Sequence, residues 1–331
     1  MTAPRYSTAW WLPGAHLQTL WGKLFRRQPL QNTRVERIDT PDGDFLDIHH
    51  VDALPGAPHL VLFHGLEGTI RSHYIQSMLG EAGRRGWGAS VVIFRSCSEE
   101  MNRTRRFYHS GETSDMALAL ERIRDTVPSS SILLAGVSLG GNVLLKFLGE
   151  TGDNVPSGVK AAVAISVPFD LSRSARYIDR GFSRVYQKHF IRSLSRKATL
   201  KRKTFPDLVD PAHLAAIRTM RDFDNTMTAP LHGFTDAEDY YARSSSLGWL
   251  GRIRINTLLL SAVDDPFLPP QVLDDVRAVA RRNPRLHLDF PRHGGHAGFV
   301  GGWNPLKPIY YIERRTGDFL AEQLMQMTQS N

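Results

Sequence analysis

Short apolar runs alternate along this sequence with longer amphipathic stretches, and this alternation constrains the fold more than any other feature. The strand-like runs lie at 35–38, 45–51, 59–63, 89–94, 131–137, 159–167, 256–262 and 285–290. The helical stretches lie at 72–85, 113–125, 142–149, 270–282 and 311–327. Most of the runs lack polar alternation, which is typical of parallel strands buried on both faces. The order predicts an α/β protein with a mostly parallel sheet and helices on both of its faces.

The alternation is interrupted once, between the strand that ends near Val167 and the strand that begins near Asn256. These about ninety residues contain no strand pattern, and a connection of that length is expected to carry its own structure. We therefore predict a basic helical cap or lid at 170–247, inserted between the sixth and seventh core strands. The chain is expected to form a single domain over 1–331, in which 1–54 supply an N-terminal arm and the first strands.

A serine lies between a buried strand and the helix that follows it, in Gly136-Val137-Ser138-Leu139-Gly140. The two glycines allow the sharp turn that projects a serine hydroxyl above the sheet edge at a helix N-terminus. At that point, unpaired backbone N–H groups and the helix dipole favour developing negative charge. We therefore identify Ser138 as the candidate nucleophile, in preference to a purely structural glycine turn.

A serine hydroxyl needs a base to take its proton and an acid to orient that base. In this architecture the three are expected in the order serine, acid, histidine. Asp264 and Asp265 follow the seventh core strand, and His296 lies in a glycine-rich loop after the last strand. We prefer Asp265, where the following prolines turn the loop away, and keep Asp264 as the alternative. His296 is preferred to His293 because glycines flank it on both sides.

The loop His64-Gly65-Leu66-Glu67-Gly68 follows the third strand. An acyl-transfer site of this kind uses two backbone donors for the tetrahedral oxyanion, one directly after the nucleophile and one in this loop. The expected donors are the N–H groups of Leu139 and Leu66. His64 is expected to support the loop by hydrogen bonding rather than to carry a proton.

The other reactive side chains are expected to have structural roles. Glu112 and Asp115 lie at the start of the predicted helix 113–125, where carboxylates satisfy free N–H groups. His109 and Glu112 could pair on a metal, but no third ligand is evident and triad hydrolysis needs none, so no metal or cofactor is expected. Cys97, the one cysteine, is expected to be packed rather than reactive. A single cysteine also excludes an internal disulfide scaffold.

Seven ordered motifs extend over nearly the whole chain. They are His16-Leu-Gln-Thr-Leu20, His64-Gly-Leu-Glu-Gly68, Phe94-Arg-Ser-Cys97, Tyr108-His-Ser-Gly-Glu-Thr113, Gly136-Val-Ser-Leu-Gly-Gly-Asn142, Asp264-Asp-Pro-Phe267 and Gly294-Gly-His-Ala-Gly-Phe299. This set resembles the YheT-like branch of the α/β-hydrolase superfamily, the bacterial relatives of the animal ABHD esterases and lipases. The resemblance implies an α/β-hydrolase fold and a serine-dependent carboxylic ester hydrolase. Its triad would consist of Ser138, an aspartate of the Asp264-Asp265 pair, and His296.

The sequence departs from the family pattern at Ser96, where glycine is expected in an Arg-Gly-Cys block. It also lacks the membrane-spanning N-terminus of the animal members, so the resemblance does not imply a membrane-lipid substrate. The expected substrates are small or medium acyl esters, with lipid-derived esters included. Cleavage of a thioester, amide or peptide by the same triad remains an alternative. No signal-peptide pattern and no run of about 20 apolar residues is present, which indicates a cytoplasmic protein.

The net charge of +8 is concentrated in one segment. Residues 172–205 carry eleven basic residues and a single acid, Asp179, whereas the rest of the chain has 30 basic and 32 acidic residues. Basic residues recur every fourth position at Arg176, Arg180, Arg184, Lys188, Arg192 and Arg196, and apolar ones at Ile178, Phe182, Tyr186, Phe190 and Leu194. On a helix these rows lie on roughly opposite sides. The apolar row could cover the active site while the basic row faces water or, as a peripheral contact, an anionic membrane. No nucleic-acid-binding motif accompanies them, so nucleic acid is not an expected partner.

Overall fold

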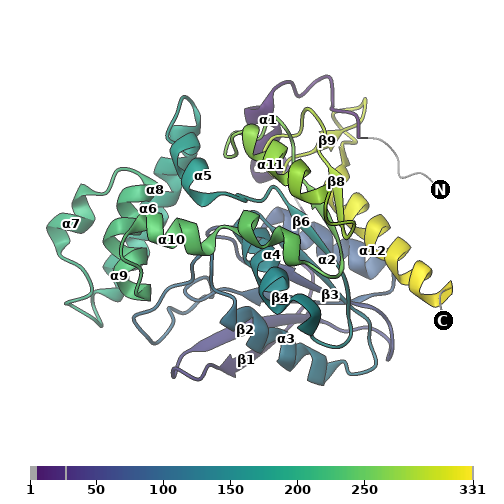
Figure 1. Cartoon of the computed structure of the whole chain (residues 1–331), viewed down its shortest axis with the longest axis horizontal. Helices are drawn as coiled ribbons and strands as arrows, with labels where there is room; N and C mark the ends of the chain where they lie inside the picture. The colour runs from purple at the N-terminus through teal and green to yellow at the C-terminus, as the bar shows by residue number, and fades with distance from the viewer. Residues whose placement is uncertain (1–5, 27, 330–331) are drawn as a thin grey trace.

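The computed structural model describes residues 6–26 and 28–329. Its centre is an eight-stranded sheet in the order β1-β2-β4-β3-β5-β6-β7-β8 (Figure 1). The strands are β1 (Arg34–Asp39), β2 (Phe45–Val51), β3 (His59–Phe63), β4 (Gly88–Ile93), β5 (Ile132–Val137), β6 (Val159–Ile165), β7 (Asn256–Leu260) and β8 (Leu286–Asp289). The pairings from β4 across to β8 are parallel, whereas β2 pairs antiparallel with β1 and β4. This confirms the predicted, mostly parallel α/β sheet.

Helices cover both faces of the sheet. On one face, α2 and α12 contact each other, and on the other α4 contacts both α3 and the strands β5 and β6 (Figure 1). The helices of this body are α1 (Ala15–Phe25), α2 (His73–Arg84), α3 (Ser114–Thr126), α4 (Leu139–Thr151), α11 (Gln271–Ala280) and α12 (Tyr311–Gln329). A short 3₁₀ turn, η1 (Gly152–Asn154), follows α4, and a small separate sheet pairs β9 (Val300–Gly301) with β10 (Ile309–Tyr310). Within the described ranges, no helix is long and apolar enough to cross a membrane.

One helix begins earlier than its sequence pattern predicts. The stretch expected to be helical at 142–149 is α4, which starts at Leu139 and continues to Thr151. No linker separates it from β5, because Ser138 alone makes the turn from strand to helix. The nucleophile candidate therefore lies directly at a helix N-terminus.

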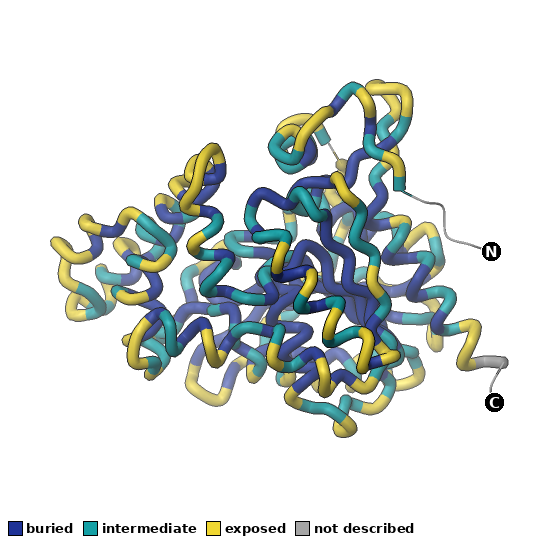
Figure 2. Tube along the Cα trace, turned by 45° about the horizontal axis from the view of Figure 1, so that its top comes forward, coloured by how far each residue is buried: buried dark blue, intermediate teal, exposed yellow. Residues whose placement is uncertain are grey.

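The hydrophobic core lies around the middle strands of the sheet. Every residue of β3, β4 and β5 is buried, as the uninterrupted apolar runs predict (Figure 2). One of these positions is a histidine, His59, whose Nε2 lies 2.7 Å from the Ser90 hydroxyl. Two further histidines are the buried His64 and the partly buried His73, and burial lowers the pKa of all three to about 4.

These histidines predict a loss of stability in mild acid. Below pH 6.5 the unfolded chain binds protons that the folded histidines cannot accept, so their full contribution is present above pH 6.5 and is lost towards pH 4. At about 1.4 kcal/mol per unit of pKa displacement, the three histidines together contribute several kcal/mol to the free energy of unfolding. Burial raises the pKa of Asp224 to about 6, which offsets part of this loss. We expect urea unfolding to give a clearly lower free energy of unfolding at about pH 5 than at about pH 7.5, with a smaller difference in His73→Asn. Equal values at the two pH values would contradict this account.

The chain between β6 and β7 forms a helical insertion at one end of the molecule (Figure 1). Its elements are α5 (Leu171–Ile178), α6 (Ser183–Lys201), α7 (Pro211–Ala216), α8 (Met220–Phe223), the π-helical turn η2 (Asp224–Thr228), α9 (Ala229–His232), α10 (Ala237–Ser244) and the 3₁₀ segment η3 (Ser246–Arg252). Two small apolar clusters hold it together, one of them between α6 and the α7–η2 region. The insertion thus has a core of its own beside the main one.

The basic row and the apolar row at 176–196 were expected to lie on one continuous helix, and this expectation is wrong. The rows are divided between α5 and α6, and the chain turns between them at Gly181, where φ is +51°. All six members of the basic row are nevertheless exposed. In the apolar row, Ile178, Tyr186 and Leu194 are buried, but Phe182 lies in the turn and is 50% exposed.

Candidate active site

Ser138 lies at the carboxyl edge of the sheet, in the turn between β5 and α4. Its backbone has φ +54° and ψ −120°, a conformation that is strained for any residue other than glycine. Its N–H donates to Ile165 O at 2.8 Å, and its carbonyl accepts from Asn142 N–H at 3.0 Å. These bonds fix the turn so that the serine side chain projects beyond the sheet edge.

The two motif glycines are needed because backbone segments approach closely on both sides of this turn. A Cβ atom on Gly136 would lie 2.5 Å from Gly140 O. A Cβ atom on Gly140 would lie 2.4 Å from His64 O and 2.5 Å from Phe63 O. Gly140 therefore allows α4 to pack directly against the end of β3, which brings the loop after β3 next to the serine.

We expect Gly140→Ala to lower the free energy of unfolding by about 1–3 kcal/mol, because the added methyl group meets backbone atoms that cannot move aside. The matched control is Gly83→Ala in α2, where nothing lies within 4 Å of the new Cβ atom. There the substitution is expected to raise the free energy of unfolding by about 0.5–1 kcal/mol, as alanine does in helices. Urea unfolding of both variants measures the difference, and a neutral Gly140→Ala would refute the packing argument.

The two adjacent aspartates in the loop after β7 pair with two different histidines in the loop after β8. Asp265 is 1% exposed, and its two carboxylate oxygens lie 2.9 and 3.1 Å from His296 Nδ1. Asp265 also accepts from Phe267 N–H at 2.8 Å. A carboxylate oxygen of Asp264 instead lies 3.1 Å from His293 Nδ1, and the His293 side chain is 61% exposed. The structure therefore pairs Asp265 with His296, and the two less favoured candidates with each other.

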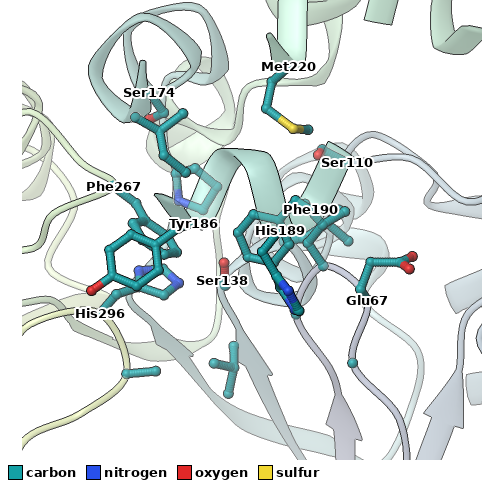
Figure 3. A pocket seen from close by; sticks show the side chains of 18 of the residues that line it. Glu67, Ser110, Ser138, Ser174, Tyr186, His189, Phe190, Met220, Phe267 and His296 are labelled. Carbon is teal, nitrogen blue, oxygen red and sulfur yellow. The ribbon is translucent and has the colours of Figure 1, made fainter. Parts of the chain in front are cut away.

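Ser138 and His296 both line one large cavity, and Figure 3 shows the serine hydroxyl and the imidazole projecting into it. No hydrogen bond joins the two side chains in this structure. The Phe267 ring stacks on the His296 ring with centroids 4.1 Å apart. The ring orientation of His296 is thus set by Asp265 on its Nδ1 side and by Phe267 on its face, and its Nε2 has no hydrogen-bond partner among the residues that the structure describes.

The loop after β3 lies beside the serine turn, and both segments contribute residues to the cavity wall. Leu66 and Leu139 both line the cavity, and the N–H group of neither has an acceptor within the described residues. His64 Nε2 accepts from Phe94 N–H at 3.1 Å, so its Nδ1 carries the proton and donates to Gly65 O at 2.8 Å. Burial keeps the pKa of His64 at about 4, so a neutral His64 braces the loop.

The cavity has a volume of about 790 Å³ and is bounded by the loops at the carboxyl edge of the sheet, by α1 and by the insertion. Its walls include Thr19, Leu20, Lys23 and Leu24 from α1. Others come from the insertion, among them Leu171, Ile178, Tyr186, Phe190 and Phe223. Sequence reasoning assigned the N-terminal arm no part in the site. The dense apolar and aromatic residues of this arm were the available signal. In the structure the arm contacts the insertion, where His16 Nδ1 lies 3.2 Å from the Tyr186 hydroxyl of α6.

A cluster beside the cavity differs from its sequence-based description. His232 joins His109 and Glu112, with one ligand atom from each within 4.8 Å of the others, so a third potential metal ligand does exist. The donor set nevertheless fits a metal poorly. His109 Nδ1 accepts from Gly111 N–H at 3.1 Å, so in the neutral ring Nε2 carries the proton and offers no lone pair. Arg106 also binds the Glu112 carboxylate. Ion pairing therefore accounts for Glu112, whereas the buried Nε2 atom of His232 has no hydrogen-bond partner among the described residues.

One other local expectation, the role of Asp115, is revised by the structure. Glu112 accepts from Ser114 N–H at 3.2 Å at the start of α3, as predicted, but Asp115 does not cap that helix. Its carboxylate instead receives two hydrogen bonds of 2.7 Å from the buried Arg95. Ser96, where the resemblance led us to expect glycine, has a left-handed φ of +63°, a conformation that favours glycine. Cys97 is buried, and burial raises the pKa of its thiol to about 11.

Comparisons with known proteins identify the family. A family model described as "alpha/beta hydrolase fold" matches residues 58–302. The chain is 39% identical over 314 residues to the "Putative esterase YheT" of Escherichia coli (strain K12), covering 93% of this chain and 91% of that protein. It is 29% identical over 321 residues to the "Phospholipase ABHD3" of Bos taurus, covering 94% and 76%. It is 31% identical over 252 residues to a "Monoacylglycerol lipase" of Saccharomyces cerevisiae, covering 73% and 55%.

Solved structures agree on the fold. The esterase Pf2001 of Pyrococcus furiosus aligns with a TM-score of 0.57 at 15% sequence identity, over 91% of this chain and 95% of that one. At this identity the likeness concerns the architecture alone. The sheet order, the serine turn between β5 and α4, and the sequence matches lead to one assignment. The chain belongs to the α/β-hydrolase family, in its YheT-like branch.

Proposed function

We propose that this protein is a serine-dependent carboxylic ester hydrolase with Ser138 as nucleophile, His296 as base and Asp265 as the orienting acid. The observation that carries the proposal is that His296, paired with the buried Asp265, lines the same cavity as a serine held on a strained strand-to-helix turn. All three triad positions are filled, and they follow one another in the order serine, acid, histidine that this fold uses. The names of the YheT and ABHD3 relatives support ester hydrolysis.

In the proposed reaction, the Ser138 hydroxyl attacks the ester carbonyl while His296 Nε2 takes its proton. Asp265 stabilises the imidazolium and holds the tautomer that accepts this proton. The tetrahedral oxyanion is bound by the N–H groups of Leu66 and Leu139, and loss of one such donor typically costs about 3 kcal/mol. His296 then protonates the leaving alcohol, and water cleaves the acyl-enzyme by the same steps. The hydrogen bond from Ser138 to His296 is expected to form as substrate binds.

The proposed substrates are small or medium acyl esters, including lipid-derived ones. A cavity of about 790 Å³ is of the size that encloses such ligands, and apolar side chains from α5, α6 and α8 line it. The names of two relatives, a phospholipase and a monoacylglycerol lipase, point the same way. A thioester, amide or peptide bond is the alternative, and rates on substrates matched in acyl group distinguish them.

A fluorophosphonate probe tests the proposal directly, because it reacts only with an activated serine. We expect a single adduct on the peptide that contains Ser138, formed in parallel with loss of p-nitrophenyl butyrate hydrolysis. Prior addition of the ester should slow labelling. An adduct on another serine, or hydrolysis that survives complete labelling of Ser138, would refute the assignment.

We further propose that the insertion makes a peripheral contact with an anionic lipid surface. Arg180, Lys188 and Arg192 are exposed, and no carboxylate of the described residues lies within salt-bridge distance of them. Apolar side chains at the cavity rim are exposed beside them, with Phe182 at 50% and Val185 at 57%. Cations next to apolar side chains are what an anionic interface attracts.

We expect the protein to sediment with phosphatidylglycerol vesicles but not with phosphatidylcholine vesicles. A triple Arg180→Gln, Lys188→Gln, Arg192→Gln variant should bind about 100-fold more weakly, at roughly 1 kcal/mol for each residue. The matched control changes Arg281, Arg282 and Arg292 to Gln, three exposed residues outside the insertion. Equal losses in the two triple variants would show a general charge effect and contradict the contact.

A further inference from the structure

The loop that carries the proposed oxyanion donor Leu66 is anchored on both sides of that residue. Gly65 N–H donates to the Tyr74 hydroxyl at 3.0 Å, and Glu67 N–H donates to the Tyr108 hydroxyl at 2.7 Å. Glu67 itself has φ +56°, a left-handed conformation that is unfavourable for a residue with a side chain. Such a conformation persists only where the surrounding contacts fix it.

The contacts that fix Glu67 come largely from the inserted helix α6. Lys197 Nζ lies 2.6 Å from Glu67 Oε1, and the Ser193 hydroxyl donates to Oε2. The Tyr108 hydroxyl donates to Oε1 at 2.9 Å. The Glu67 side chain is 9% exposed and that of Lys197 is 18% exposed. Figure 3 shows the Glu67 carboxylate directed away from Ser138, so it is placed to anchor the loop and not to touch the reacting atoms.

Lys197 differs from the exposed cations of its helix. Lys188 and Arg192 face outward, whereas Lys197 and Ser193, one helical turn apart, share the face turned towards the loop. Separating a buried ion pair leaves each charge unpaired in a poorly solvated place. The seating of α6 and the conformation of Glu67 are therefore energetically linked.

We propose that Lys197 is a positioning residue for the oxyanion hole, acting through Glu67. While α6 is seated, Lys197 and Ser193 hold the carboxylate, and the strained Glu67 backbone keeps the N–H of Leu66 directed at the cavity. When α6 moves away, Glu67 loses these partners and the donor loses its fixed direction. The inference rests on the proposed function and adds to it a link between the position of the insertion and the chemical step.

Substitution of Lys197 by methionine tests this, because it keeps the chain length and removes the charge. For p-nitrophenyl butyrate we expect kcat to fall about 10- to 100-fold, less than the roughly 10²–10³ lost when a donor is removed outright. KM should stay near the wild-type value, since the donor acts in the transition state. An alkyl trifluoromethyl ketone forms a tetrahedral adduct with the serine, so its inhibition constant should rise by the same factor as kcat falls.

Three further variants sharpen the result. Glu67→Gln keeps the shape of the side chain and loses the charge, so it tests the same contact if Lys197→Met does not fold. The double variant, Lys197→Met with Glu67→Gln, should lose no more kcat than the worse of the two single variants, because both substitutions break the same interaction. Lys203→Met removes an exposed lysine just beyond the same helix and should behave as wild type.

An unchanged kcat in a folded Lys197→Met or Glu67→Gln protein would overturn the proposal, and so would an effect confined to KM. Reduced stability with an unchanged inhibition constant would show a purely structural contact and overturn it as well. Failure of the proposed function is recognised separately. It would appear as wild-type hydrolysis that does not depend on Ser138, which is measured first.

Discussion

Replacement of Ser138 by alanine should lower kcat for p-nitrophenyl esters by roughly 10⁵–10⁶-fold, because removal of the nucleophile leaves only binding and the oxyanion donors to act. The fold should tolerate the change. The Ser138 side chain makes no capping hydrogen bond to α4, and alanine has the same backbone preferences at φ +54°. We therefore expect an inactive protein whose free energy of unfolding is near the wild-type value, measured by hydrolysis rates and by urea unfolding.

The matched control is Ser174→Ala, which removes a hydroxyl from the wall of the same cavity. The Ser174 hydroxyl is buried and has no hydrogen-bond partner among the described residues. This variant should hydrolyse the same esters at a rate of the wild-type order. Hydrolysis by Ser138→Ala at the wild-type rate would rule out the serine mechanism, whatever the behaviour of the control.

Replacement of Asp265 by asparagine should lower kcat about 10⁴-fold, whereas the same change at Asp264 should cost less than about tenfold. An asparagine at 265 can still accept from Phe267 N–H, so the local turn is kept. It no longer stabilises the imidazolium, and it favours the wrong tautomer of His296, whose Nδ1 lies 2.9 Å from the carboxylate. Asp264 contacts Gly295 N–H and the exposed His293, neither of which reaches the cavity wall.

The adjacent aspartates make this a closely matched pair of variants. The two substitutions change charge and side-chain volume equally and lie at neighbouring positions in the chain. Hydrolysis rates at saturating p-nitrophenyl butyrate measure the effect. Equal losses, or a larger loss in Asp264→Asn, would show that the acid was assigned to the wrong residue. Urea unfolding of both proteins controls for a general disturbance of the loop.

The fold was predictable because its signals are local. Uninterrupted apolar runs such as 132–137 are buried on both faces of the sheet, and their alternation with helices allows few topologies. The position of Ser138 followed from the same kind of signal, since Gly136 and Gly140 are required by backbone contacts within one turn. The break between α5 and α6 was missed, because a row spaced by four residues continues across a turn at Gly181 without change.

Contacts between distant segments were less accessible. His232 was not recognised as a neighbour of His109, because more than a hundred residues separate them and no spacing rule connects the two. The part of α1 in the cavity wall was missed for the same reason. Its residues contact α6 of the insertion, and an arm rich in apolar side chains does not specify which surface it covers.

The sequence by itself determined the parallel sheet, the helical insertion and the serine at the turn between β5 and α4, because periodicity and turn chemistry act within a few residues of the chain. Only the tertiary structure decided that Asp265 faces His296 while Asp264 faces His293. It alone decided that Lys197, one of eleven cations in one segment, pairs with Glu67. The physical reason is common to both. Neighbouring positions on a loop or helix point in different directions, and which direction meets a partner depends on how segments far apart in the chain pack together.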